Sequence, residues 1–153
     1  MIFPRQRLLA ILLAGVWLAV SAAAVASSDA GIIRLEACGH RITAELAISP
    51  AARQRGLMHR AALPDDHGML FVYAKPERIC MWMKDTPIPL SVAFLDDRGV
   101  IINIAEMQPL TLDTHCAERP ARYALEMTRG WFTRRGLTPG TRITGLDQLP
   151  ARP

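Results

Sequence analysis

The chain has 153 residues, half of them hydrophobic, and a formal net charge of +4. This length fits one folded domain. The charge is mild, and no basic block is interleaved with aromatic residues, which argues against nucleic-acid binding.

The first 26 residues have the three-part layout of a secretory signal peptide. Arg5 and Arg7 precede an apolar run over 8–20, and the segment ends in the small-residue pattern Ala24-Val25-Ala26. We expect cleavage after Ala26, which predicts a periplasmic or secreted protein with no stable membrane span. The alternative is an uncleaved membrane anchor, because the apolar stretch over 8–26 is almost long enough to cross a bilayer.

Three cysteines follow this segment: Cys38, Cys80 and Cys116. In an oxidising compartment two of three cysteines normally form a disulfide. We expect the Cys80–Cys116 bridge, because each cysteine lies just outside a predicted strand, where two connecting segments can meet. Cys38 is then a free thiol in a turn.

The first half of the mature chain predicts strands around one short helix. Apolar residues alternate over 42–48, and with a shorter segment over 32–35 they predict a hairpin. Ser49-Pro50 is a typical helix start, and Gly56 is a typical helix end. A buried strand is predicted over 69–73. Over 79–84 an extended chain places Met81 and Met83 on one face and Trp82 on the other.

The second half predicts a central hairpin over 90–105, joined by the turn Asp96-Asp97-Arg98-Gly99. A strand over 121–127, a helical turn over 129–135 and a short strand over 141–144 follow. No βαβ alternation is evident. We therefore predict a mainly β protein, a compact antiparallel β-sandwich or barrel with two short helices. It forms a monomeric single domain over 27–146, and 147–153 is a loose C-terminal tail.

Six ordered motifs identify a family resemblance across about 42–143. They are Arg55-Gly56-Leu57-Met58, Gly68-Met69-Leu70-Phe71, Met81-Trp82-Met83-Lys84-Asp85-Thr86 with Ile88-Pro89-Leu90, Asn103-Ile104-Ala105-Glu106, Pro120-Ala121-Arg122-Tyr123-Ala124-Leu125-Glu126, and Arg135-Gly136-Leu137-Thr138-Pro139-Gly140. The chain resembles the DUF192 family, a domain of unknown function, in an exported, proteobacterial-type form. The resemblance implies a mainly antiparallel β structure with short helices and brings no established activity. The family pattern usually has Asn where this chain has Asp85.

The candidate ligand site comprises Arg55, Trp82, Lys84, Asp85 and Glu126. An aromatic ring surrounded by charged groups suits a polar ligand such as a sugar or a carboxylate. In the alternative interpretation, Lys84–Glu126 and Arg55–Asp85 are internal ion pairs that fix the strand register, and Trp82 belongs to the core.

The leading hypothesis is an exported binding or accessory module for an unknown small polar ligand or envelope component. Its rival is a cell-envelope hydrolase that uses Glu106 and Glu126 as paired carboxylates. No nucleophile–base set is evident, so no catalytic residue is assigned and enzyme activity is left open.

Copper handling is a further alternative, because thioethers and imidazoles suit Cu(I). The residues that suggest it are Met58, Met69, Met81, Met83, Met107 and Met127, with His59, His67, His115 and Cys116. Their spacing matches no metal motif, so we predict core packing for the methionines and no metal or cofactor. Trp131 and Phe132 are predicted to cover the core, with a surface patch for a partner protein as the alternative.

Overall fold

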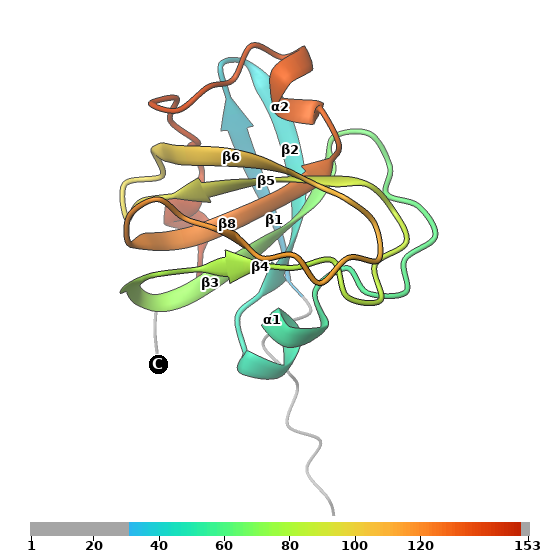
Figure 1. Ribbon diagram of the computed structural model, residues 1–153. Coiled ribbons are helices and arrows are strands. Elements are labelled where there is room, and N and C mark those ends of the chain that lie inside the picture. Colours follow the sequence, from blue (N-terminus) through green and yellow to red (C-terminus); the bar gives the residue numbers. More distant parts are fainter. Residues whose placement is uncertain (1–30, 151–153) are drawn as a thin grey trace, which may run out of the picture.

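The computed structural model describes residues 31–150, and the predicted signal peptide lies outside them. Six strands form one sheet in the order β1-β2-β3-β8-β5-β6, and β4 pairs with β7 in a small second sheet. The strands are β1 (Ile32–Ala37), β2 (His40–Ala47), β3 (His67–Glu77), β4 (Cys80–Met81), β5 (Leu90–Leu95), β6 (Ile101–Met107), β7 (His115–Cys116) and β8 (Ala121–Thr128). In Figure 1, β1 and β2 cross β5, β6 and β8 at a steep angle, so the large sheet is strongly twisted.

The mainly β class with two short helices is confirmed, but the large sheet is mixed. β2 and β3 are parallel, whereas the other neighbouring strands in the sheet are antiparallel. A parallel pair needs a crossover connection, and the helix α1 (Pro50–Arg55) lies on it. This β2-α1-β3 unit corrects the expectation that the chain has no βαβ alternation. The helix has only six residues, so its periodicity is too short to reveal the crossover.

Both helices lie where the sequence predicts them. The Ser49 side chain accepts a hydrogen bond from the Ala52 N–H at 3.2 Å, and Gly56 follows the last turn of α1 with φ of +46°. The second helix, α2 (Trp131–Arg134), follows β8 almost directly. Figure 1 shows α1 and α2 at opposite ends of the molecule.

Two hydrophobic cores lie on opposite faces of the sheet. The α2-side core joins β1 and β2 to Trp131 and Phe132, and the α1-side core joins Ala52 and Leu57 to β4. Every residue of β5 is buried, because the strand contributes to both cores. A strand buried on both faces gives a continuous apolar run instead of an alternating pattern. Trp131 and Phe132 are 1% and 0% exposed, so their predicted core position is confirmed.

The disulfide prediction is also confirmed. Cys80 and Cys116 are bridged, and they are directly opposite each other in the β4–β7 pair. Cys38 is a free, exposed cysteine in the turn between β1 and β2.

The C-terminal segment packs against the sheet. The predicted strand over 141–144 consists of two isolated bridges, Glu36–Thr144 and Val100–Arg142. A 3-10 helix, η1 (Leu146–Gln148), follows, and the Gln148 amide donates to the Arg34 carbonyl at 3.0 Å. The segment expected to form a loose tail therefore contacts the sheet as far as Leu149, which packs on the α2-side core.

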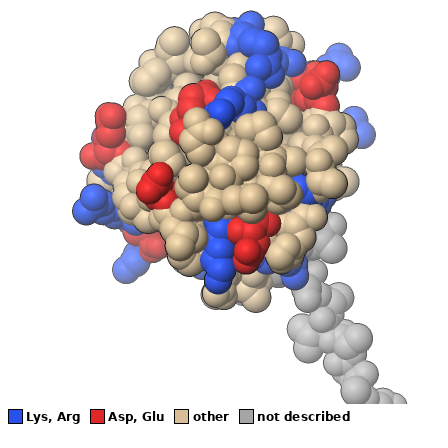
Figure 2. All heavy atoms as spheres, turned by 45° about the vertical axis from the view of Figure 1, so that its right-hand side comes forward, with Lys and Arg blue, Asp and Glu red and all other residues tan. Residues whose placement is uncertain are grey.

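Charged side chains of both signs are interspersed around an uncharged middle on the face shown in Figure 2. Within residues 31–150, none of the helices is long and apolar enough to cross a membrane.

Candidate functional site

The site is centred on Glu126, in the middle of the central strand β8. Its register partners are Met69 on β3 and Val92 on β5. Because side chains alternate along a strand, Leu125 and Met127 enter the α2-side core while Glu126 points to the α1 side. Only 4% of Glu126 is exposed.

Close backbone packing around Glu126 explains one glycine of the family motifs. A Cβ atom at Gly68 would lie 2.3 Å from the Glu126 carbonyl oxygen and 2.3 Å from the Met127 sulfur. No side chain fits there without moving β8. Gly68 therefore allows β3 to approach β8 at the residue that carries the carboxyl group.

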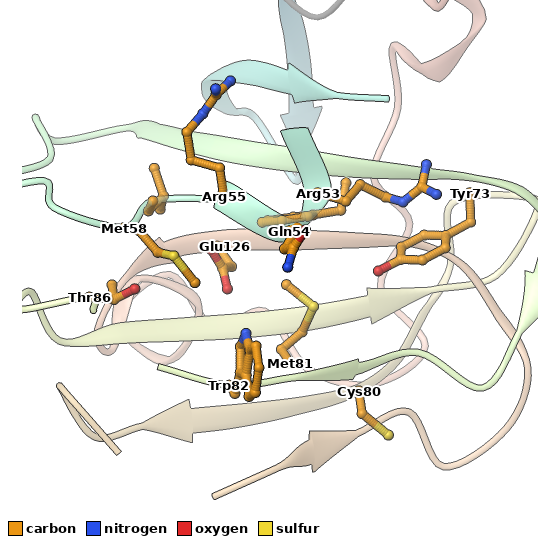
Figure 3. A pocket seen from close by; sticks show the side chains of 13 residues that line it. Arg53, Gln54, Arg55, Met58, Tyr73, Cys80, Met81, Trp82, Thr86 and Glu126 are labelled. Carbon is orange, nitrogen blue, oxygen red and sulfur yellow. The ribbon is translucent and has the colours of Figure 1, made fainter. Parts of the chain in front are cut away.

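A cavity of about 220 Å³ opens above Glu126, between α1 and the chain around β4. In Figure 3, Glu126 lies deep between the side chains of α1 and those of Met81 and Trp82. We call this space the inner cavity. It is lined by Arg53, Gln54, Arg55, Gly56, Leu57, Met58, Phe71, Tyr73, Cys80, Met81, Trp82, Thr86 and Glu126.

The Glu126 carboxyl has no hydrogen-bond or ion-pair partner among residues 31–150. Burial disfavours its charged form and raises the pKa of Glu126 from 4.5 to about 8. At neutral pH the group is therefore mostly protonated, so it can both donate and accept a hydrogen bond.

Arg53 and Tyr73 form one wall of the inner cavity. The Arg53 guanidinium donates to the carbonyls of Ile48 and Val72 and lies 4.7 Å from the centre of the Tyr73 ring. Burial raises the pKa of Tyr73, and the charge of Arg53 opposes this in part. Tyr73 is thus a neutral phenol, and Figure 3 shows its hydroxyl directed toward the middle of the cavity, as is the indole nitrogen of Trp82.

A second space, the outer hollow, adjoins the inner cavity. It measures about 290 Å³ and shares Gln54, Arg55, Met58 and Trp82 with the inner cavity. Lys84 lines only the outer hollow, with its ammonium 5.9 Å from the centre of the Trp82 ring.

Two cations mark this outer end. In Figure 3 the Arg55 side chain extends away from Glu126. The ion pairs found among residues 31–150 involve neither Arg55 nor Lys84. Arg55 and Lys84 therefore place positive charge at the outer end that no acidic side chain among residues 31–150 neutralises, while Arg53 adds a further cation at the wall of the inner cavity.

The structure brings together four of the five predicted site residues. Arg55, Trp82 and Glu126 line the inner cavity, and Lys84 lines the outer hollow. The alternative ion pairs of Lys84 with Glu126 and of Arg55 with Asp85 do not form within 31–150. Trp82 is 43% exposed, whereas its neighbours Met81 and Met83 are 7% and 0% exposed, which confirms the predicted alternation and excludes Trp82 from the core.

Asp85 lines neither space. Its φ angle is +52°, in the left-handed region, and its carbonyl accepts a hydrogen bond from the His59 N–H at 2.8 Å. Asn and Asp tolerate this conformation better than other non-glycine residues. The family preference for Asn at this position therefore has a backbone explanation.

Sequence analysis missed several residues of the inner cavity, above all Arg53, Gln54 and Tyr73. Arg53 and Gln54 directly precede the motif that begins at Arg55, which is the one local signal that points to them. Tyr73 lies beyond the motif on β3 and joins the site because α1 packs beside that strand. Met58 and Met81, for which the sequence predicts core packing, also line the cavity.

The register of β5 separates the two acids of the predicted hydrolase. Glu106 pairs with Ser91 and Glu126 pairs with Val92, so the two carboxyl groups lie on opposite faces of the sheet. The Glu106 carboxylate accepts a hydrogen bond from the Ser91 hydroxyl at 2.8 Å, and its Oε2 atom lies 3.6 Å from Nε of Arg129 in an ion pair. The paired-carboxylate mechanism is therefore wrong, because these acids do not flank one cleft.

The methionines considered for copper are mostly core residues. All of them except Met58 are buried. Among residues 31–150, no group of three or more His, Cys, Asp or Glu side chains is arranged to hold a metal ion. Met58 and Met81 both line the inner cavity, where their thioethers form part of its apolar wall.

Comparison with known proteins agrees with this fold. A crystal structure from Sinorhizobium meliloti, described as a candidate transcription regulator, is 36% identical with a TM-score of 0.70, over 74% of this chain and 92% of that chain. A protein of unknown function from Novosphingobium aromaticivorans is 31% identical with a TM-score of 0.71, over 86% of this chain and 99% of that chain. A comparison with curated proteins gave no match. The family model of DUF192, described as uncharacterized ACR, matches residues 33–145, and the chain therefore belongs to the DUF192 family.

Proposed function

We propose that this protein is an exported binding module that holds a small polar ligand in the inner cavity. The observation that carries the proposal is Glu126, a residue only 4% exposed whose carboxyl group has no partner among residues 31–150 and lies at the floor of an open cavity. Burying a carboxyl group without a partner costs free energy. A ligand that forms a hydrogen bond or ion pair with Glu126 would offset this cost, which explains why the chain has a carboxyl group at this position.

The surrounding groups support the same proposal. Glu126, Tyr73, Gln54 and the Trp82 indole N–H offer hydrogen-bond donors and acceptors around one space. The rings of Trp82 and Tyr73 and the thioethers of the methionines supply apolar walls. A few convergent polar groups in an apolar cavity are typical of small-molecule sites.

Location follows from the N-terminal segment. The predicted signal peptide over 1–26 directs the domain to the periplasm or beyond the cell, where the Cys80–Cys116 disulfide is stable. The ligand is then a solute of that compartment or a component of the envelope.

The second candidate function is an enzyme in which Glu126 acts as a general acid. Its raised pKa favours this candidate, because a general acid must hold its proton at the working pH. Hydrolysis of envelope glycans that is present in the wild type and lost in Glu126→Gln, with an unchanged fold, would support it over simple binding.

The binding proposal is tested with the mature, oxidised protein by tryptophan fluorescence. Trp82 lines the cavity and Trp131 is buried in the other core, so the Trp82→Phe variant identifies the signal that belongs to the site. Monosaccharides, carboxylates, amines and amino acids are titrated as separate classes. We expect a saturable change with at least one class and its loss in Glu126→Ala.

Gln148→Ala is the matched control, because Gln148 lines a separate groove near β1 and β2. It should bind like the wild type. Circular dichroism shows whether Glu126→Ala keeps its fold. No saturable response to any class, in a folded wild type, would contradict the binding proposal.

A further inference from the structure

We propose that the ligand is a small zwitterion, whose ammonium group pairs with Glu126 in the inner cavity and whose carboxylate lies in the outer hollow at Arg55 and Lys84. This inference rests on the proposed binding function and assigns its ligand class. It follows from the way charge is divided between two connected spaces. Glu126 lies at the inner end, and Arg55 and Lys84, which form no ion pair within residues 31–150, line the outer end; the inner cation Arg53 is held by the carbonyls of Ile48 and Val72.

The inner end suits an ammonium group for two reasons. A buried carboxyl without a partner is best stabilised by a cation that forms a charge-assisted hydrogen bond with it. The cavity also presents the aromatic rings of Trp82 and Tyr73, which attract cations. Both rings already lie beside a cation of the chain, Arg53 at 4.7 Å from the centre of the Tyr73 ring and Lys84 at 5.9 Å from that of Trp82, so Glu126 is the group that mainly favours an ammonium here.

The outer end suits a carboxylate. Arg55 and Lys84 come from two segments, α1 and the chain after β4, and both line the outer hollow. Glu126 is the only acidic side chain that lines either space within residues 31–150. A carboxylate at the outer hollow thus meets two cations and no competing acid.

A ligand confined to one end leaves the other end unsatisfied. A simple amine pairs with Glu126 but places nothing at Arg55 and Lys84, and a simple acid does the reverse. A molecule with both groups satisfies both ends, and the four residues shared by the two spaces show that they adjoin. Free amino acids and the ends of short peptides are two sources of this chemistry.

Proton exchange provides a signature of this binding mode. The charged or titratable groups around Glu126 are Arg53 and Arg55 from α1, Tyr73 from β3 and Lys84 from the chain after β4. In the empty site Glu126 holds its proton at neutral pH. An ammonium ligand must displace that proton to form the ion pair, so binding releases a proton. This release should fade above about pH 8, where Glu126 is already ionised.

The test is isothermal titration calorimetry on the mature, oxidised protein with matched probes. The zwitterions are γ-aminobutyrate and ε-aminocaproate, and each is compared with the amine and the acid of the same chain length. Glycylglycine represents a peptide. We expect a zwitterion to bind at least about tenfold more tightly than its matched amine or acid, which corresponds to roughly 1.4 kcal/mol. Titrations in two buffers of different ionisation enthalpy should show the proton release at neutral pH.

Two variants test which residue binds which charged group of the ligand. Glu126→Gln should weaken the zwitterion and the amine about tenfold or more and leave the acid unchanged. Lys84→Ala should weaken the zwitterion and the acid and leave the amine unchanged. Arg98→Ala, which removes an exposed cation from the β5–β6 turn, is the control and should bind like the wild type.

The outcomes separate this inference from the binding proposal. Equal affinity for a zwitterion and its matched acid, or binding without proton release at neutral pH, overturns the inference. The same holds if a monosaccharide saturates the site and no zwitterion does; the binding proposal then stands. If neither the calorimetric probes nor the fluorescence panel binds, both fail.

Discussion

Two buried acids of this protein behave in opposite ways. Asp96, in the β5–β6 turn, is 5% exposed, and Glu126 is 4% exposed. Burial alone would raise the pKa of Asp96, but the backbone N–H groups of Val100 and Arg98 donate to its carboxylate at 2.9 Å and lower it overall. Glu126 accepts no such hydrogen bond from the described part of the chain, and burial raises its pKa.

The comparison shows that hydrogen-bond partners, and not the degree of burial, decide whether a buried acid keeps its charge and stabilises the fold. Asp96 stabilises a turn by satisfying two backbone N–H groups. Glu126 satisfies no polar group among residues 31–150 and lies in a cavity. Asp96 therefore stabilises the fold, whereas Glu126 makes no such contact within residues 31–150, which is why we propose a ligand as its partner.

The largest expected effect comes from Glu126→Gln, measured by urea unfolding across pH. In the unfolded chain the acid ionises above about pH 4.5, while in the empty folded protein it stays neutral up to about pH 8. Wild-type stability should therefore fall as the pH rises through this window, by at most roughly 5 kcal/mol. Glu126→Gln should lack the slope, so its advantage over the wild type grows with pH.

Glu118→Gln makes the same chemical change at an exposed position and should keep the wild-type slope. If Glu126→Gln instead destabilises the protein near pH 8, then the carboxyl has a structural partner and the contrast with Asp96 fails.

A smaller effect is expected at Asp96. Asp96→Ala should cost roughly 1–3 kcal/mol at neutral pH, because two N–H groups lose their acceptor. The folded pKa is lowered, so the stabilising contribution is present above about pH 4 and is lost as the pH falls further. Urea unfolding at neutral and acidic pH measures both.

Asp97→Ala, at the exposed neighbouring residue, should change stability by only about 0.5 kcal/mol or less. Equal losses for Asp96→Ala and Asp97→Ala would show that the two N–H groups at the turn do not depend on Asp96.

The smallest effect is expected at Asp85, which lies beside the site without lining it. Asp85→Asn should be neutral within about 0.5 kcal/mol, since Asn adopts the left-handed backbone readily. Asp85→Val should cost roughly 1–2 kcal/mol, because a β-branched side chain is strained there.

Thermal unfolding and ligand titration together test the role of Asp85. Both variants should keep wild-type affinity for whichever probe binds. A loss of affinity in Asp85→Asn at unchanged stability would assign Asp85 to the site after all.

Local chemistry in the sequence determined much of this fold. Ser49, Pro50 and Gly56 delimit α1, and the alternation of Met81 and Met83 with Trp82 places the indole at the surface. The family motifs and the Cys80–Cys116 bridge were predicted from the same information. The limits of α1 and the alternation depend on neighbouring residues, the family on motifs that keep their order, and the bridge on the few cysteines available to pair, so each can be predicted from the sequence alone.

Only the tertiary structure decided how distant segments share space. The parallel pairing of β2 with β3 places α1 over β3, which brings Arg53 beside Tyr73. The β5 register places Glu106 and Glu126 on opposite faces. The pattern of β8 predicts which side Glu126 faces, but not that α1 and the β4 segment cover that side and leave a cavity there. The burial of Glu126, and its lack of a partner within residues 31–150, depend on contacts between segments far apart in the chain, which local periodicity does not encode.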